Sequence, residues 1–290
     1  MSSTLISLLS GLGGMFGWGI YDFFAGVYSK TIGPYKTFFW SQLAGLSFIL
    51  LVFFLLGNPF PATLGALALL PIAAIFYSLG YIFFMKGFEI GNISIVAAIM
   101  NLWAVFTMLT AFLFMGQRLT PLQSLGVTMI ICGAIFASLN WHGIDTGKRF
   151  QLSAGVKETI LGAFFFGTFW NISEIISEQL GWLPTTLFVK IGIILFLLLL
   201  SYRSGQKLGL LTVDTRTKSM ILLIGFIEAG AVALVNYGLT VGDAILITPI
   251  ASALSVVTIA LAVVLLKEKV STLQGVGILT AVSGIIITGV

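Results

Sequence analysis

The sequence predicts an all-α integral membrane protein of ten transmembrane helices, arranged as a 5+5 inverted repeat. Three observations predict it: the composition, ten long apolar runs, and an internal repeat with a constant offset. Of the 290 residues, 58% are hydrophobic and 8% are charged, and the mean hydropathy is +1.11. Soluble domains carry about 25% charged residues. A chain this poor in charge is therefore expected to have lipid as its main solvent.

Ten apolar runs are each long enough to cross roughly 30 Å of hydrocarbon as a helix. Short polar breaks that are rich in Gly, Pro and charged residues separate them. Membrane-spanning β-strands would alternate in segments of about ten residues, whereas these runs are continuous and much longer. The predicted spans are 4–28, 34–56, 64–85, 93–115, 121–140, 154–177, 184–203, 219–240, 244–266 and 271–289.

The two halves of the chain repeat each other. Residues 87–138 align with 238–289 without a gap, at a constant offset of 151. Earlier in the halves the match is looser, and an offset of 150 pairs Gly17 with Gly167. Five spans are an odd number, so the halves must enter the membrane from opposite sides. Inverted repeats of this kind build transporters whose substrate site lies near the midplane, between the halves. The predicted units are a first repeat (1–140), a connecting loop (141–153) and a second repeat (154–290).

The chain has few residues for metal, redox or nucleotide chemistry. Cys132 is the only cysteine and His142 the only histidine, so neither a metal cluster nor an intramolecular disulfide is expected. No nucleotide-binding loop appears, and we expect no cofactor and no nucleic-acid partner. An ion gradient, exchange or the substrate's own gradient would then drive transport, with proton coupling as one option. The apolar N-terminal run lacks a basic segment and is too long for a signal peptide, so it is expected to remain as the first span.

A charge inside a span marks a functional site by default, and we single out four of the charged residues that lie inside predicted spans. They are Asp22, Glu174, Lys190 and Glu228. At 1.5 Å per residue, Glu228 lies about 2 Å and Lys190 about 5 Å from the middle of their spans. Asp22 and Glu174 lie about 9 and 12 Å off centre, where water can reach them from an interface. A central carboxylate is tolerated only if it is paired, protonated or exposed to a hydrated cavity.

The repeat places Glu228 at the position of Tyr77, because the two are 151 residues apart. Two polar groups at equivalent depths are expected to face each other across the pseudo-two-fold axis and to line a central cavity. The alternative is a buried structural pair or a permanently neutral acid. Lys190 is predicted to supply the opposite charge to Glu228, with Glu174 as its competing partner.

Further polar side chains accompany these charges. Span six carries a polar stripe at helical spacing, formed by Trp170, Asn171, Glu174, Ser177 and Glu178. Trp18 shares a face of span one with Asp22, and Asn101 adds an amide in span four. The predicted substrate or ion pathway is therefore Glu228, Tyr77, Lys190, Asp22, Glu174, Asn171, Trp170 and Asn101.

A local motif ends each half. A Thr or Ser starts the last span, a Gln follows three residues later, then a Gly after three more and a second Gly after seven. These residues are Thr120, Gln123, Gly126 and Gly133 in the first half, and Ser271, Gln274, Gly277 and Gly284 in the second. With its 5+5 arrangement the chain resembles the EamA-type ten-span carriers of the drug/metabolite transporter superfamily. It departs from the family pattern at Gln117, where a glutamate is usual.

The resemblance implies a secondary transporter, and export of amino acids or related small polar metabolites is the leading interpretation. Import or exchange of sugars or nucleotide sugars is the alternative within the superfamily. An intramembrane enzyme would need a histidine inside the membrane to activate a nucleophile, and the only histidine of this chain lies in a predicted loop. A membrane scaffold would not need matching polar groups at the midplane. We expect a multi-pass protein of the plasma (inner) membrane, as a monomer or homodimer.

Lysine and arginine residues are distributed unevenly among the loops, and this bias sets orientation. Twelve of the fourteen flank odd-numbered loops, Arg118 flanks an even loop and Lys190 lies inside a span. The count predicts cytoplasmic odd loops and both termini outside, whereas the resemblance implies termini inside. We predict both termini outside, because the bias in the Lys and Arg count is large.

Overall fold

The computed structural model describes residues 3–56, 64–116, 118, 120–138, 154–241 and 244–288. Over these residues the chain forms twelve α-helices and no β-strand, which confirms the all-α class. The helices are α1 (Ser3–Ile32), α2 (Pro34–Leu56), α3 (Leu64–Ile90), α4 (Ile93–Met100), α5 (Leu102–Phe114), α6 (Pro121–Ser138), α8 (Val156–Leu180), α9 (Trp182–Ser204), α10 (Thr215–Leu239), α11 (Ala244–Ser252), α12 (Leu254–Leu266) and α13 (Thr272–Thr288).

Six segments are long and apolar enough to cross a membrane, by length and composition. They are Pro34–Leu56, Gly65–Ile90, Ile95–Phe114, Val156–Leu180, Trp182–Ser204 and Thr215–Leu239. Two shorter apolar segments lie in α6 and across α11 and α12. The chain is thus a multi-pass membrane protein, but six of the ten predicted spans meet these criteria. The other predicted spans fall short in length or composition over the described residues.

Two predicted spans are each broken into two helices. The span predicted at 93–115 consists of α4 and α5 with Asn101 between them, and the span at 244–266 consists of α11 and α12 with Ala253 between them. The breaks lie 152 residues apart, within one residue of the repeat offset. Discontinuous helices are common around the substrate sites of inverted-repeat carriers. Hydropathy predicted one continuous helix over each of these runs, because apolar residues flank both breaks.

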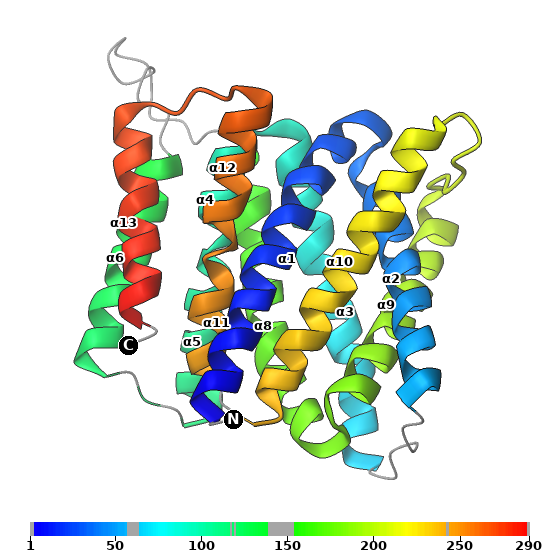
Figure 1. Ribbon diagram of the computed structural model, residues 1–290, viewed down its shortest axis with the longest axis horizontal. Coiled ribbons are helices and arrows are strands. Elements are labelled where there is room, and N and C mark those ends of the chain that lie inside the picture. Colours follow the sequence, from blue (N-terminus) through cyan, green and yellow to red (C-terminus); the bar gives the residue numbers. More distant parts are fainter. Residues whose placement is uncertain are drawn as a thin grey trace.

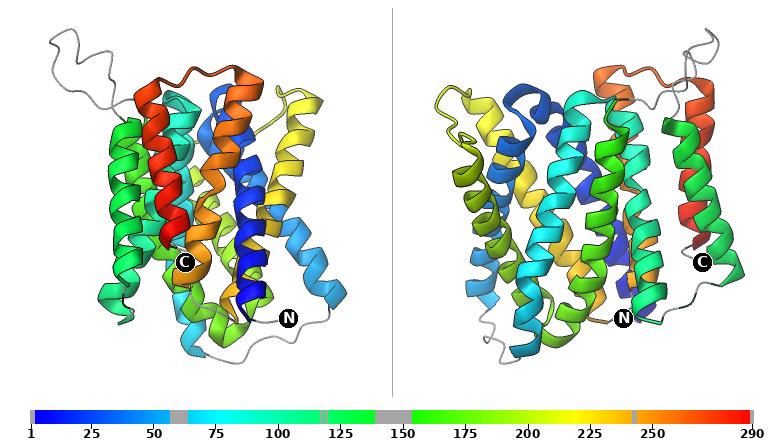
Figure 2. Two further views of the ribbon diagram at one scale, coloured as in Figure 1. Left: turned by 60° about the vertical axis from the view of Figure 1, so that its left-hand side comes forward. Right: turned by 180° about the vertical axis from the view of Figure 1, so that it is seen from behind.

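Helices from the two halves pack on each other in equivalent pairs. α1 crosses α10 on one side of the molecule, and α3 packs on α8 on the opposite side (Figures 1 and 2). α1 and α8 are the first helices of their halves, and α3 and α10 belong to the third span of each half. The last helices, α6 and α13, pack on each other at one edge (Figure 1). The largest hydrophobic cluster draws on both halves, so the core lies at the seam between them.

Two equivalent hydrogen bonds refine the alignment of the halves. Thr107 Oγ1 donates to the backbone oxygen of Gly167 at 2.9 Å, and Thr258 Oγ1 donates to that of Gly19 at 3.0 Å. The threonines are 151 residues apart, whereas the glycines are 148 apart. These contacts therefore pair Gly167 with Gly19 rather than with Gly17.

The helix connections that carry many basic residues lie at one end of the molecule. The α1–α2, α9–α10 and α12–α13 connections share this end, and the N-terminus lies at the opposite end (Figure 1). Lys30 donates there to the backbone oxygen of Gly91 at 3.0 Å. Asp214 caps α10 by accepting from the Thr217 N–H at 2.9 Å, and the hydrogen bonds from Thr217 lower the pKa of this carboxyl. Lys148, Arg149 and the predicted loop 141–153 lie outside the described residues.

The motif that ends the second half is a helix start. The Ser271 N–H donates to Gln274 Oε1 at 3.1 Å, and the Gln274 N–H donates to Ser271 Oγ at 3.2 Å. This reciprocal arrangement is a capping box for α13. Glu268, in the turn before it, accepts from the N–H of Ile93 at 3.3 Å, at the positive end of α4. This hydrogen bond joins the two halves. Gln117, the counterpart of Glu268 in the first half, lies outside the described residues.

Glycines bring α6 and α13 close together. A Cβ on Gly284 would lie 2.6 Å from the backbone oxygen of Gly126 and 2.8 Å from the Cβ of Met129. Backbone atoms cannot move aside as a flexible side chain can. Small residues at helix interfaces allow such close approach in membranes.

Gly284→Ala is expected to lower the melting temperature (Tm) of the purified protein, because overpacking against backbone costs about 1–3 kcal/mol. Gly275→Ala on the same helix is the control, since no atom lies within 4 Å of its added Cβ and alanine has the higher helix propensity. Thermal melting in detergent measures both variants. Equal melting temperatures for Gly284→Ala and the parent would contradict the close packing of α6 on α13.

Candidate functional site

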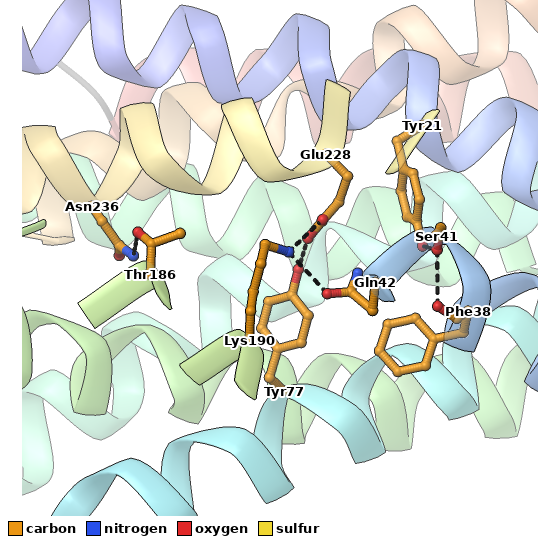
Figure 3. A network of polar contacts seen from close by, with 9 residues as sticks. All are labelled: Tyr21, Phe38, Ser41, Gln42, Tyr77, Thr186, Lys190, Glu228 and Asn236. Atoms are coloured by element: carbon orange, nitrogen blue, oxygen red, sulfur yellow. Dashed lines mark hydrogen bonds and ion pairs between the residues drawn. The ribbon is translucent and has the colours of Figure 1, made fainter. Parts of the chain in front are cut away.

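A buried ion pair lies at the seam between the halves. The Lys190 ammonium on α9 donates to Glu228 Oε2 on α10 at 2.7 Å, and also to Gln42 Oε1 on α2 at 2.9 Å. The Tyr77 hydroxyl on α3 donates to Glu228 Oε1. Figure 3 shows the four side chains pointing toward one another from four different helices. Each is at most 1% exposed, so the network is closed off from solvent.

The sequence anticipates most of this geometry. Tyr77 and Glu228 are 151 residues apart and touch each other, as the repeat offset predicts. Lys190 pairs with Glu228, the first of its two predicted partners. In this conformation the two acceptors of the Glu228 carboxylate are engaged by protein groups. Its predicted role in lining a hydrated pathway stays a prediction.

Close packing of α2 on α10 makes room for the pair. A Cβ on Gly45 would lie 2.9 Å from the backbone oxygen of Gly225 and 3.3 Å from Lys190 Nζ. The absence of a side chain at Gly45 therefore lets the lysine reach the seam. The remaining amide group of Gln42, Nε2, has no hydrogen-bond partner among the described residues.

The ion pair is held at an energetic cost. Transfer of two charges from water to a low-dielectric interior is expensive, and the mutual attraction offsets it only when geometry and extra hydrogen bonds are good. Here Tyr77 and Gln42 supply those extra hydrogen bonds. Removal of one partner leaves the other charge stranded, which typically costs about 3–5 kcal/mol.

A second polar group lies two helical turns away on α10. Asn236 accepts from Ser173 Oγ of α8 at 2.9 Å and donates to Thr186 Oγ1 of α9 at 2.8 Å (Figure 3). The sequence-based prediction missed Asn236 and Gln42. Both are amides inside apolar runs, which is the same signal that identified Asn101 and Asn171.

Asn171 and Glu174, two residues of the predicted polar stripe of span six, are both buried. Asn171 Nδ2 donates to the backbone oxygen of Thr107 at 2.9 Å and to the Thr110 hydroxyl, which ties α8 to α5. Glu174 and Asp22, which lie at depths where water can reach a side chain from an interface, are 2% and 0% exposed. Depth along a single helix did not reveal that neighbouring helices cover both side chains.

Three tryptophans form an aromatic cluster beside the network. Trp18, Trp103 and Trp170 lie around Phe166, with ring centroids 5.1–6.3 Å apart. Phe169 connects the cluster to Tyr77, at 4.9 Å between ring centroids. The three indole N–H groups have no hydrogen-bond partner among the described residues. Asn101, buried at the break between α4 and α5, is the remaining predicted residue.

The described residues hold no cluster of three or more His, Cys, Asp or Glu side chains that could bind a metal ion. The ion pair, the buried amides and the aromatic cluster can recognise a ligand by charge, hydrogen bonding and aromatic contact.

A double-mutant cycle is expected to show that Lys190 and Glu228 depend on each other. Lys190→Met and Glu228→Gln should each lower the Tm, by the equivalent of about 3–5 kcal/mol, because a single charge remains buried. The double variant should recover most of this loss. Thermal melting of all four proteins measures the coupling free energy.

The exposed pair of Lys86 and Glu89, whose side chains are 49% and 30% exposed, provides the matched control. Neutralising it should change stability by less than about 1 kcal/mol. Additive losses at Lys190 and Glu228 would contradict the paired geometry.

Comparison with known proteins follows the same division into halves. A family model described as the EamA-like transporter family matches residues 5–139 and 154–290. A solved structure described as "Crystal structure of protein" is similar in fold, with a TM-score of 0.69 and 16% identity over 99% of this chain and 95% of that chain. None of the curated proteins matches the chain.

Proposed function

Because the chain belongs to the EamA-like transporter family, we propose that it exports amino acids or related small zwitterionic metabolites across the plasma (inner) membrane. Ten spans in two inverted repeats and alternating access to a midplane site are part of the proposal. The observation that carries it is the buried network of Lys190, Glu228, Tyr77 and Gln42, to which both halves contribute.

The ion pair presents one positive and one negative group at the seam. A zwitterion carries the same two charges, so its carboxylate can take the place of Glu228 beside Lys190 and its ammonium that of Lys190 beside Glu228. Charge-assisted hydrogen bonds of this kind are about twice as strong as neutral ones. Such a substrate would offset the cost of separating the pair. It would therefore favour the open conformation by its differential affinity for that state.

Sugar transport is the second candidate. The Tyr77 hydroxyl donates to Glu228, and the rings of Tyr21 and Tyr81 lie beside it. A neutral sugar would hydrogen-bond to tyrosine hydroxyls without separating the charges. The ring centroid of Tyr81 lies 5.7 Å from that of Tyr21 and 4.9 Å from that of Tyr77. Family membership supports transport rather than catalysis for either candidate.

Amino acids are expected to raise the Tm of the purified protein, whereas sugars and nucleotides are not. A ligand that binds only the native state adds about 2.7 kcal/mol of stability at 100 times its Kd. The double variant Lys190→Met/Glu228→Gln serves as the control, because it should fold but lose the shift. Uptake of the stabilising compounds into proteoliposomes then measures transport.

Stabilisation and uptake of sugars alone would replace the amino-acid proposal by the sugar proposal. Stabilisation by amino acids without any movement across the bilayer would point to a binding subunit instead. Equal stabilisation of the parent and the double variant would remove the ion pair from the substrate site.

The orientation proposed from the Lys and Arg count can be tested with single cysteines. Cys132, which is exposed on α6, is first replaced by alanine. Thr212→Cys, in the exposed α9–α10 connection, is expected to be shielded from an impermeant thiol reagent in intact cells. Val241→Cys, at the opposite end and 42% exposed, should be labelled. The reverse pattern would place the termini inside, as the family resemblance implies.

A further inference from the structure

Asp22 is a buried carboxyl that the network around Glu228 does not use. Its side chain is 0% exposed, and neither carboxyl oxygen has a hydrogen-bond partner among the described residues. An isolated carboxylate in such a place is so costly that the group takes up a proton instead. Asp22 is therefore a neutral acid in this closed conformation.

The surroundings of Asp22 contain acidic and phenolic groups. α1 packs on α2, α3, α4, α10, α11 and α12. The titratable groups that interact with Asp22 are Tyr21 from α1 itself, Tyr81 from α3 and Glu228 from α10. Helices α4, α11 and α12 contain no titratable residue, and Tyr35 and Lys36 of α2 lie in its first turn. No ion pair to Asp22 forms among the described residues, and Lys190 is engaged by Glu228.

The fold itself does not require a carboxyl at this place. The pairing of Gly19 with Gly167 sets Asp22 opposite Trp170 in the second half, because the same 148 residues separate them. An indole thus occupies the equivalent position without loss of the architecture. The acid is specific to the first half, where it lies buried and unpaired.

Asp22 is connected electrostatically to the ion pair. Asp22 and Glu228 repel each other when both are ionised. Tyr81 interacts with Asp22 and packs 4.9 Å from the ring of Tyr77, whose hydroxyl donates to Glu228. Any step that changes the partner of Glu228 therefore changes the cost of a charge on Asp22.

We propose that Asp22 is the proton-binding site through which this carrier couples transport to a proton gradient. The carboxylate takes one proton from water when the seam is open to one side. Without substrate it crosses the closed conformation as a neutral acid and returns the proton to water on the other side. It crosses back ionised only together with bound substrate, whose ammonium group offsets its charge. No other bond forms or breaks. The inference rests on the proposed transport function and adds the coupling ion to it.

The first readout needs no substrate. The purified parent, Asp22→Asn and the control Glu89→Gln, which changes an exposed carboxyl on α3, are melted between about pH 5 and pH 8. A proton held in the folded state and released on unfolding makes stability fall as the pH rises. The Tm of the parent and of the control should therefore fall across this range, and that of Asp22→Asn should fall less. Asp22→Ala, which removes the carboxyl without adding volume, is the second variant if Asp22→Asn does not fold.

The second readout is transport in proteoliposomes, with a radiolabelled mixture of the common amino acids as the probe. Exchange at equal pH on both sides is compared with accumulation driven by an imposed pH gradient. The parent and the control should accumulate label. Accumulation by Asp22→Asn should be at least tenfold lower than that of the parent and should not vary with pH. Exchange by this variant should stay detectable.

Each contrary result has a distinct meaning. Gradient-driven accumulation by Asp22→Asn, or an unchanged dependence of its Tm on pH, would overturn the proton site. So would a parent that exchanges amino acids without responding to the gradient, although the transport function would then stand. Melting that depends on Asp22 and pH, without amino-acid exchange, would support the proton site and contradict the proposed substrate.

Discussion

The cost of burying charge is the constraint on which the centre of this protein depends. Lys190 and Glu228 are tolerable in a closed core only because each neutralises the other and because Tyr77 and Gln42 complete their hydrogen bonds. These four side chains come from α2, α3, α9 and α10, so neither half can satisfy the pair alone. The seam therefore closes around one specific set of contacts. Any group that enters must replace them with contacts of comparable strength.

The repeat explains why the pair lies where the halves meet, and the differences between the halves indicate where chemistry resides. Packing positions are shared: Thr107 and Thr258 make equivalent bonds, and α6 and α13 pack on each other through glycines. Polar positions are not shared, since Tyr77 corresponds to Glu228 and Trp170 to Asp22. A symmetric scaffold thus supports an asymmetric set of charges, as a carrier with one preferred substrate orientation would need.

Much of the fold could be predicted from the sequence because hydrophobic run length and repeat offset are regular properties of the chain. The offset of 151 correctly brought Tyr77 to Glu228. The breaks at Asn101 and Ala253 were not predictable from composition, since apolar residues flank both and a single amide does not by itself end a helix. Burial of Asp22 was also missed, because it depends on how neighbouring helices rotate and cover that face. The count of ten spans was read from hydropathy alone, and six segments meet the criteria in the structure.

The central claim is that the closed seam opens alternately to the two sides of the membrane. Ser41, beside Gln42 on α2, tests it most directly, because it is fully buried and bonded to the Tyr21 hydroxyl at 2.9 Å. Ser41→Cys in a Cys132→Ala background is treated with an impermeant thiol reagent, from outside in right-side-out vesicles and from inside in inverted ones. We expect modification from both sides, slowed by amino acids at saturating concentration. A cysteine that stays unreactive from both sides in a protein that still transports would contradict the account.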